Sequence, residues 1–184
     1  MQLIQKGPDI PDGLMQAHEE GRVVFFCGAG ISYPAGLPGF KGLVEKLYAG
    51  LGTSPTDIEK SAIKRREFDT AIGLLENRVP GGREKVRQQI AQILTPTDFK
   101  HPRVTATHRA LITLARNKDG RHRLITTNFD RIFEAVLAGD DTIASSAAPR
   151  LPVPKRRWSG IVYLHGLLPE KVSIGDLDAL VDGI

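Results

Sequence analysis

Cysteine is almost absent from this chain, since Cys27 is the single one among 184 residues. One thiol cannot form an internal disulfide, and it cannot supply the four thiolates of a Cys-only zinc site. Long apolar runs are also missing: none approaches the roughly 20 residues needed to span a bilayer, and the N-terminus has no signal-peptide core. The sequence therefore predicts a cytoplasmic protein without zinc and without membrane contact.

Charge of one sign is not concentrated in any segment. The 25 Lys and Arg residues outnumber the 21 Asp and Glu residues and give a net charge of +4, spread along the chain. That balance suits an anionic ligand but does not require nucleic acid. Lys155-Arg156-Arg157-Trp158 could contact nucleic acid or the anionic ligand, although a short basic loop is most often only solvated. Nucleic-acid binding therefore stays open.

Strand-like and helix-like apolar patterns alternate along the chain. Consecutive apolar residues predict a strand over residues 22–27 covered on both faces, and further strands over residues 123–127 and 161–164. Helical spacing predicts a short helix after Pro11 and others over residues 39–51, 68–75, 86–94 and 104–115, and Asn128 is expected to open a last one. We therefore expect one domain over residues 1–184, with a Rossmann-like, open, mainly parallel α/β sheet, flanking helices and a helical insertion at about residues 40–117.

The unusual residues follow the predicted strands. Ligands of open parallel sheets bind outside the carboxyl ends of the strands. The three strands end in Gly28-Ala29-Gly30, in the segment 127–130 and in His165-Gly166. All of these residues are therefore expected at one edge of the sheet.

The first of these turns has two interpretations. Gly28 and Gly30 would let the chain turn sharply and let an anion approach the backbone at the start of the next helix. The turn is not the usual dinucleotide fingerprint, because Tyr33 stands where the third glycine belongs, and no Gly-Lys-Ser or Gly-Lys-Thr of a P-loop follows. Alone, it predicts a tight strand-to-helix turn at least as well as a phosphate site.

Four separate segments together resemble one family. They are Gly28-Ala29-Gly30-Ile31-Ser32, Gly36-Leu37-Pro38, Thr126-Thr127-Asn128-Phe129-Asp130 and His165-Gly166. Their order resembles the sirtuin series GAGIS, GIP, TQNID and HG, and the spellings TTNFD and YLHG resemble the sirtuin-like branch of bacterial anti-phage defence. The resemblance implies an NAD-binding fold that cleaves the bond between nicotinamide and ribose. It also implies a homo-oligomer or a partner defence protein.

Two departures from the sirtuin pattern bear on the reaction. One cysteine cannot build the four-cysteine zinc module of sirtuin deacylases, and Gly39-Phe40-Lys41 stands where those enzymes have Asp-Phe-Arg. Sirtuin-like domains also continue past His-Gly with further strands and a closing Gly-[Thr/Tyr]-Ser turn, so the resemblance predicts that this fold is incomplete at its C-terminus. These departures favour attack by water over deacylation.

The resemblance implies a role for each matching residue. Nicotinamide leaves NAD as a neutral base, so no general acid is needed, unlike in ordinary glycosidases. Asn128 would hold ribose hydroxyls or the attacking water, His165 would take a proton, and Asp130 would orient a partner or offset positive charge. Ser32 and the amides of Ala29 and Gly30 would hold the pyrophosphate. Gly28, Pro38 and Thr127 complete the predicted NAD-binding set.

Simpler interpretations exist for several of these residues. Asn128 is also a good N-cap for the next helix, and His165 could be an ordinary strand-end histidine. The four ordered segments favour the functional interpretation for both. His108 is expected to be structural, and Cys27 to be a small buried residue.

The predicted function is hydrolysis of NAD to nicotinamide and ADP-ribose in anti-phage defence. The alternative is a module that binds NAD or ADP-ribose without turnover. A deacylase or ADP-ribosyltransferase is less favoured, because the zinc cysteines are missing.

Overall fold

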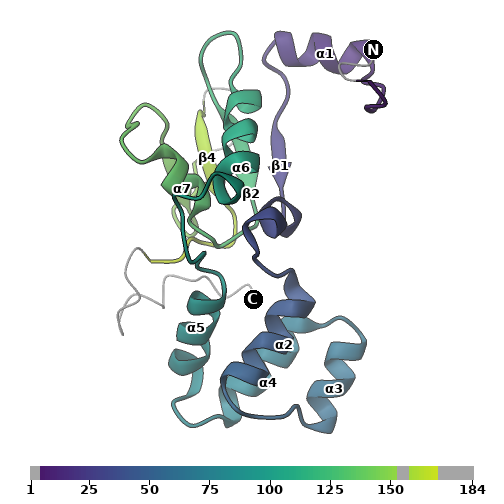
Figure 1. Cartoon of the computed structure of the whole chain (residues 1–184), viewed down its shortest axis with the longest axis vertical. Helices are drawn as coiled ribbons and strands as arrows, with labels where there is room; N and C mark the ends of the chain where they lie inside the picture. The colour runs from purple at the N-terminus through teal and green to yellow at the C-terminus, as the bar shows by residue number, and fades with distance from the viewer. Residues whose placement is uncertain (1–4, 153–157, 170–184) are drawn as a thin grey trace.

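A four-stranded parallel sheet organises the chain (Figure 1). The computed structural model describes residues 5–152 and 158–169, so most of the basic segment after Pro154 lies outside the described residues. The strands are β1 (Phe25–Cys27), β2 (Arg123–Thr126), β3 (Ser145–Ala147) and β4 (Gly160–Tyr163), in the spatial order β1-β2-β4-β3. Every neighbouring pair is parallel. The predicted Rossmann-like α/β fold is thus confirmed.

The strand register brings the carboxyl ends of the strands to one edge. Cys27 pairs with Thr126, and Thr126 pairs with Tyr163. The hydrogen bonds continue one step further, from Thr127 N to Cys27 O at 3.1 Å and from Leu164 N to Thr126 O at 2.9 Å. The segments that begin at residues 28, 127 and 164 therefore leave the sheet side by side, as predicted.

The prediction that the first strand is covered on both faces is wrong. β1 is an edge strand, and Phe26 is 65% exposed while Val24 before it is 41% exposed. Side chains alternate between the two faces of a strand. Cys27 therefore joins the core, whereas Phe26 points to the opposite, open face.

Eight helices occur within the described residues. They are α1 (Asp12–Glu19), the 3₁₀ helix η1 (Ala29–Ala35), α2 (Phe40–Gly50), α3 (Asp57–Lys64), α4 (Phe68–Arg78), α5 (Gly82–Ile93), α6 (Pro102–Ala115) and α7 (Ile132–Leu137). The sequence interpretation missed α3 and β3, which are short elements of eight and three residues. A helix-start signal was present for α3: Thr56 and Glu59 form a capping box at its N-terminus.

Seven of the eight helices fall into two groups with separate cores, and α1 belongs to neither group (Figure 1). We call α2–α5 the helical region, because these helices pack on one another around Leu47, Leu75 and Ile90. We call the sheet with η1, α6 and α7 the sheet region, whose core includes Leu124, Phe133 and Tyr163. The expected insertion at about residues 40–117 therefore contains two kinds of helix, because α6 packs on η1 and α7.

Neither region has a helix that could cross a membrane, within the residues that the structure describes.

Candidate functional site

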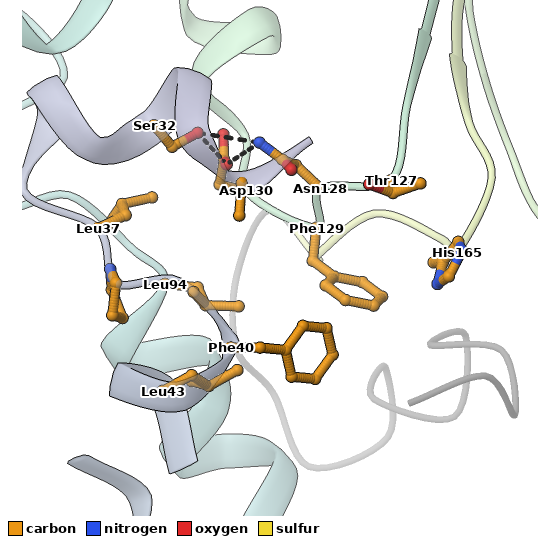
Figure 2. A pocket seen from close by; sticks show the side chains of 12 residues that line it. Ser32, Leu37, Phe40, Leu43, Leu94, Thr127, Asn128, Phe129, Asp130 and His165 are labelled. Atoms are coloured by element: carbon orange, nitrogen blue, oxygen red, sulfur yellow. Dashed lines mark hydrogen bonds between the residues drawn. The ribbon is translucent and has the colours of Figure 1, made fainter. Parts of the chain in front are cut away.

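A cavity of about 250 Å³ lies where the sheet region meets the helical region (Figure 2). Its polar lining comes from the carboxyl edge of the sheet, and its apolar lining comes largely from the helical region and the turn before it. The sheet side contributes Ala29, Ser32, Thr127, Asn128, Phe129, Asp130 and His165, and the other side contributes Leu37, Pro38, Phe40, Leu43 and Leu94. Seven of the predicted site residues thus lie around one space: Ala29, Ser32, Pro38, Thr127, Asn128, Asp130 and His165.

Ser32, Asn128 and Asp130 form a buried hydrogen-bond network on the cavity wall (Figure 2). The Ser32 hydroxyl donates to Asp130 Oδ2 at 2.7 Å. The Asn128 amide nitrogen donates to Ser32 Oγ at 3.0 Å and to Asp130 Oδ2 at 3.3 Å. Because an ionised carboxylate only accepts, these contacts fix which end of the amide is nitrogen. Asn128 Oδ1 has no hydrogen-bond donor among the described residues.

The chain between β2 and α7 holds these side chains in place. The backbone N–H of Asn128 donates to Thr126 Oγ1 at 3.0 Å, and that of Ile132 donates to Asp130 Oδ1 at 3.2 Å. In the second bond, the Asp130 side chain accepts from the backbone N–H two residues later in the chain. This is the local turn that aspartate favours. α7 begins only at Ile132, so the prediction that Asn128 opens this helix is wrong. Its amide is used in the network and not as an N-cap.

Asp130 is buried without a cationic partner. Its side chain is 5% exposed, and no lysine or arginine of the described chain forms an ion pair with it. The nearest basic group is His108, whose Nε2 lies 3.9 Å from Asp130 Oδ1. Burial lowers the pKa of His108, and the nearby Asp130 opposes this only in part. The imidazole is therefore neutral near pH 7, and it leaves the charge of the carboxylate uncompensated.

Sequence interpretation missed the position of His108 beside the site. The sequence pattern places Leu111, Ile112 and Leu114 on the apolar face of this helix, but Leu114 is 52% exposed. The face that packs inward carries Thr105, His108 and Ala115. Their spacing of three and seven residues is helical, and this stripe of small and polar residues was the available signal.

The glycine turn differs from its predicted form. Gly28 has φ −122° and ψ −172°, which is extended backbone open to any residue, and the helix that follows is a seven-residue 3₁₀ helix. A Cβ added at Gly28 would meet only Thr127 Oγ1 at 3.7 Å, and one added at Gly30 would meet nothing within 4 Å. Neither conformation nor packing within the described chain requires glycine at Gly28. The space beside the backbone is open at both positions.

His165 lines the cavity some way from the network (Figure 2). Its ring meets Phe129 edge to face, with the centroids 6.0 Å apart. It is partly buried and makes no hydrogen bond to the other described side chains. The imidazole is thus available to a ligand or a water molecule in the cavity.

Cys27 lies at the end of β1 and is buried, with 4% of its surface exposed, as predicted. Burial raises the pKa of its thiol, which disfavours the reactive thiolate. No group of three or more metal-binding side chains gathers among the described residues.

No family model matches the chain. An alignment of 176 residues gives 35% identity with the "Uncharacterized protein y4cA" of Sinorhizobium fredii. The alignment covers 92% of this chain and 14% of that protein, so the chain spans about one seventh of the relative's length. The relative's name states no activity, and the chemistry of the site is therefore argued from its own residues.

Proposed function

We propose that this chain hydrolyses NAD at the bond between nicotinamide and ribose. The observation that carries the proposal is the uncompensated buried carboxylate of Asp130 on the wall of a largely apolar cavity. A buried charge without a partner is costly, so such a group suits a ligand that brings the opposite charge. The nicotinamide-ribose unit of NAD is cationic, and positive charge moves onto the ribose as the bond breaks.

The other polar groups of the wall suit the remaining steps. Asn128 Oδ1 can accept a hydrogen bond from a ribose hydroxyl or from the attacking water. His165 can take the proton that this water loses. Water adds to the ribose carbon as the carbon–nitrogen bond breaks, and nicotinamide departs with the bonding electron pair as a neutral base. The products are nicotinamide, ADP-ribose and one proton.

The apolar side of the cavity suits the departing ring. Phe40 and Phe129 face the space from opposite regions (Figure 2). Small-molecule sites usually measure about 300–1,000 Å³, so a cavity of about 250 Å³ would enclose one part of a dinucleotide. We assign the nicotinamide-ribose part to the cavity and the pyrophosphate to the open backbone at Gly28 and Gly30.

One observation favours the second candidate function, binding of NAD or ADP-ribose without turnover. Ser32, Asn128 and Asp130 satisfy much of one another's hydrogen-bonding capacity, and His165 makes no hydrogen bond to them. If these three side chains bond mainly to one another, their role is to shape the pocket and not to take part in a reaction. The sirtuin-like motif order, including Asn128 and His165, is the reason to place hydrolysis first.

The test is incubation of the purified 184-residue chain with NAD, followed by chromatography of nicotinamide and ADP-ribose. We expect both products in equal amounts, and a loss of about 100-fold in rate in Asn128→Ala and in His165→Ala. His101→Asn is the matched control, because His101 is exposed and asparagine can keep the N-cap hydrogen bond that the His101 side chain accepts from the Arg103 N–H. Binding of NAD without product would favour the second function. The absence of both binding and product would contradict both functions.

The same motif order supports a proposed role in anti-phage defence, with a homo-oligomer or a defence protein as partner. Survival of phage-challenged bacteria that carry the wild-type or the Asn128→Ala gene tests that role.

A further inference from the structure

His108 borders the cavity network from behind. It lies on α6 with no exposed surface, and its ring packs edge-on against Phe133 with centroids 4.6 Å apart. Its Nε2 lies 3.4 Å from Ser32 Oγ, while its Nδ1 has no hydrogen-bond partner among the described residues. Buried polar groups are nearly always hydrogen-bonded, so an apolar residue would fill this position at lower cost if packing were its only role.

Counting protons around Ser32 shows which nitrogen of His108 is protonated. The Ser32 hydroxyl has one proton, and it donates that proton to Asp130 Oδ2. One acceptor site of Ser32 Oγ is occupied by the Asn128 amide, so the contact with His108 uses the other. Since Ser32 only accepts at that site, Nε2 of His108 carries the hydrogen. The unprotonated Nδ1 is then an acceptor with no donor among the described residues.

We infer that His108 is a positioning residue, whose Nε2–H holds the Ser32 hydroxyl on Asp130 and so fixes the Asn128 amide with its oxygen free for the ligand. The inference rests on the proposed function. It deepens that function, because the donors of Ser32 and Asn128 are then used inside the network. This part of the wall presents only acceptors, Asn128 Oδ1 and the Asp130 carboxylate. Such a surface selects a ligand with hydroxyl donors and a positive charge, and a cationic ribosyl group has both.

Two substitutions separate the donor of His108 from its volume. His108→Gln keeps an N–H near the position of Nε2, and His108→Met fills the space without a donor. We expect kcat for NAD cleavage to fall about 10-fold or more in His108→Met and to stay within about 3-fold of wild type in His108→Gln, because small displacements of reacting groups slow the chemical step. KM is expected to change less than kcat. Equal activity of the two variants, both with wild-type unfolding temperatures, would overturn the inference.

A second measurement needs no turnover. Nitrogen-15 NMR of the histidine rings in the wild-type chain reports which ring nitrogen is protonated, and the His108 signals are those missing from His108→Gln. We expect a neutral ring protonated at Nε2 between pH 7 and pH 8, and a shifted Nε2 signal in Ser32→Ala. A ring protonated at Nδ1, or at both nitrogens, would overturn the inference. Absence of nicotinamide release by wild type would instead contradict the proposed function, and the NMR result would still decide the role of His108.

Discussion

The helical region and the sheet region each bury one carboxylate, and they satisfy it in different ways. Glu59 in the helical region is 1% exposed and receives two hydrogen bonds from Arg78, at 2.8 Å and 3.0 Å. The backbone of Thr56 donates a third at 2.7 Å. Asp130 in the sheet region is 4% exposed, and among the described residues its hydrogen-bond donors are all neutral: Ser32, Asn128 and Ile132.

The difference separates a structural acid from one that awaits a ligand. The charge of Glu59 is neutralised within the chain, and its ion pair connects α3 to α4. The charge of Asp130 is not neutralised, and Asp130 lines a cavity. Stability is often given up where function requires an unpaired group. We therefore expect changes at Asp130 to affect activity and changes at Glu59 to affect folding.

The largest expected effect is at Asp130. Asp130→Asn keeps the shape of the side chain and removes its charge, so NAD cleavage is expected to fall about 100-fold or more. The unfolding temperature is expected to stay within about 3 °C, because relief of an unpaired buried charge offsets the lost hydrogen bonding. Product chromatography and thermal unfolding measure the two quantities. Asp57→Asn is the matched control, since that side chain is 98% exposed.

An Asp130→Asn variant with wild-type turnover would remove the distinction between the two acids. A variant that loses both activity and its cooperative unfolding would place Asp130 with Glu59 as a structural residue.

The next largest effect is expected at Glu59, where stability and not activity should change. Glu59→Gln removes the charge that Arg78 pairs with and is expected to lower the unfolding temperature by about 5–10 °C. The rate of NAD cleavage at 20 °C is expected to stay within about 2-fold, because the ion pair lies outside the cavity. Differential scanning calorimetry and the product assay test this. A large loss of activity in folded Glu59→Gln would show that the helical region is coupled to the chemistry.

A smaller effect is expected at Gly30. Gly30→Ala meets no atom within 4 Å, so stability is expected to change little. If a pyrophosphate lies against this backbone, the added methyl group would raise the dissociation constant of ADP-ribose about 10-fold, which calorimetric titration measures. Gly73→Ala in α4 is the control, because a Cβ there also meets nothing and Gly73 lies outside the cavity. Unchanged affinity in both variants would place the pyrophosphate elsewhere.

The sequence predicted the sheet and the edge that holds the site more fully than it predicted the network. Runs of apolar residues are a local signal, and they located β1, β2 and β4 to within about three residues at each end. The exposure of Phe26 depends on β1 being an edge strand, which its own sequence does not state. The contact of His108 with Ser32 joins residues 76 positions apart, and it arises only because α6 packs on η1.

The smallest expected effect concerns pH and the ion pair of Glu59. Burial acts to raise the pKa of Glu59, but the hydrogen bonds from Arg78 and Thr56 lower it by more. The pKa of Glu59 is therefore below its ordinary value of about 4.5. With a folded-state pKa below the unfolded one, the stabilisation is complete above pH 4.5 and is lost as the pH falls through the folded-state pKa. The unfolding temperatures of wild type and Glu59→Gln should therefore differ most near pH 7 and approach each other by roughly 2–4 °C between pH 5 and pH 3. A constant difference over that range would mean that the carboxylate charge of Glu59 does not stabilise the fold, and its contrast with Asp130 would then rest on packing alone.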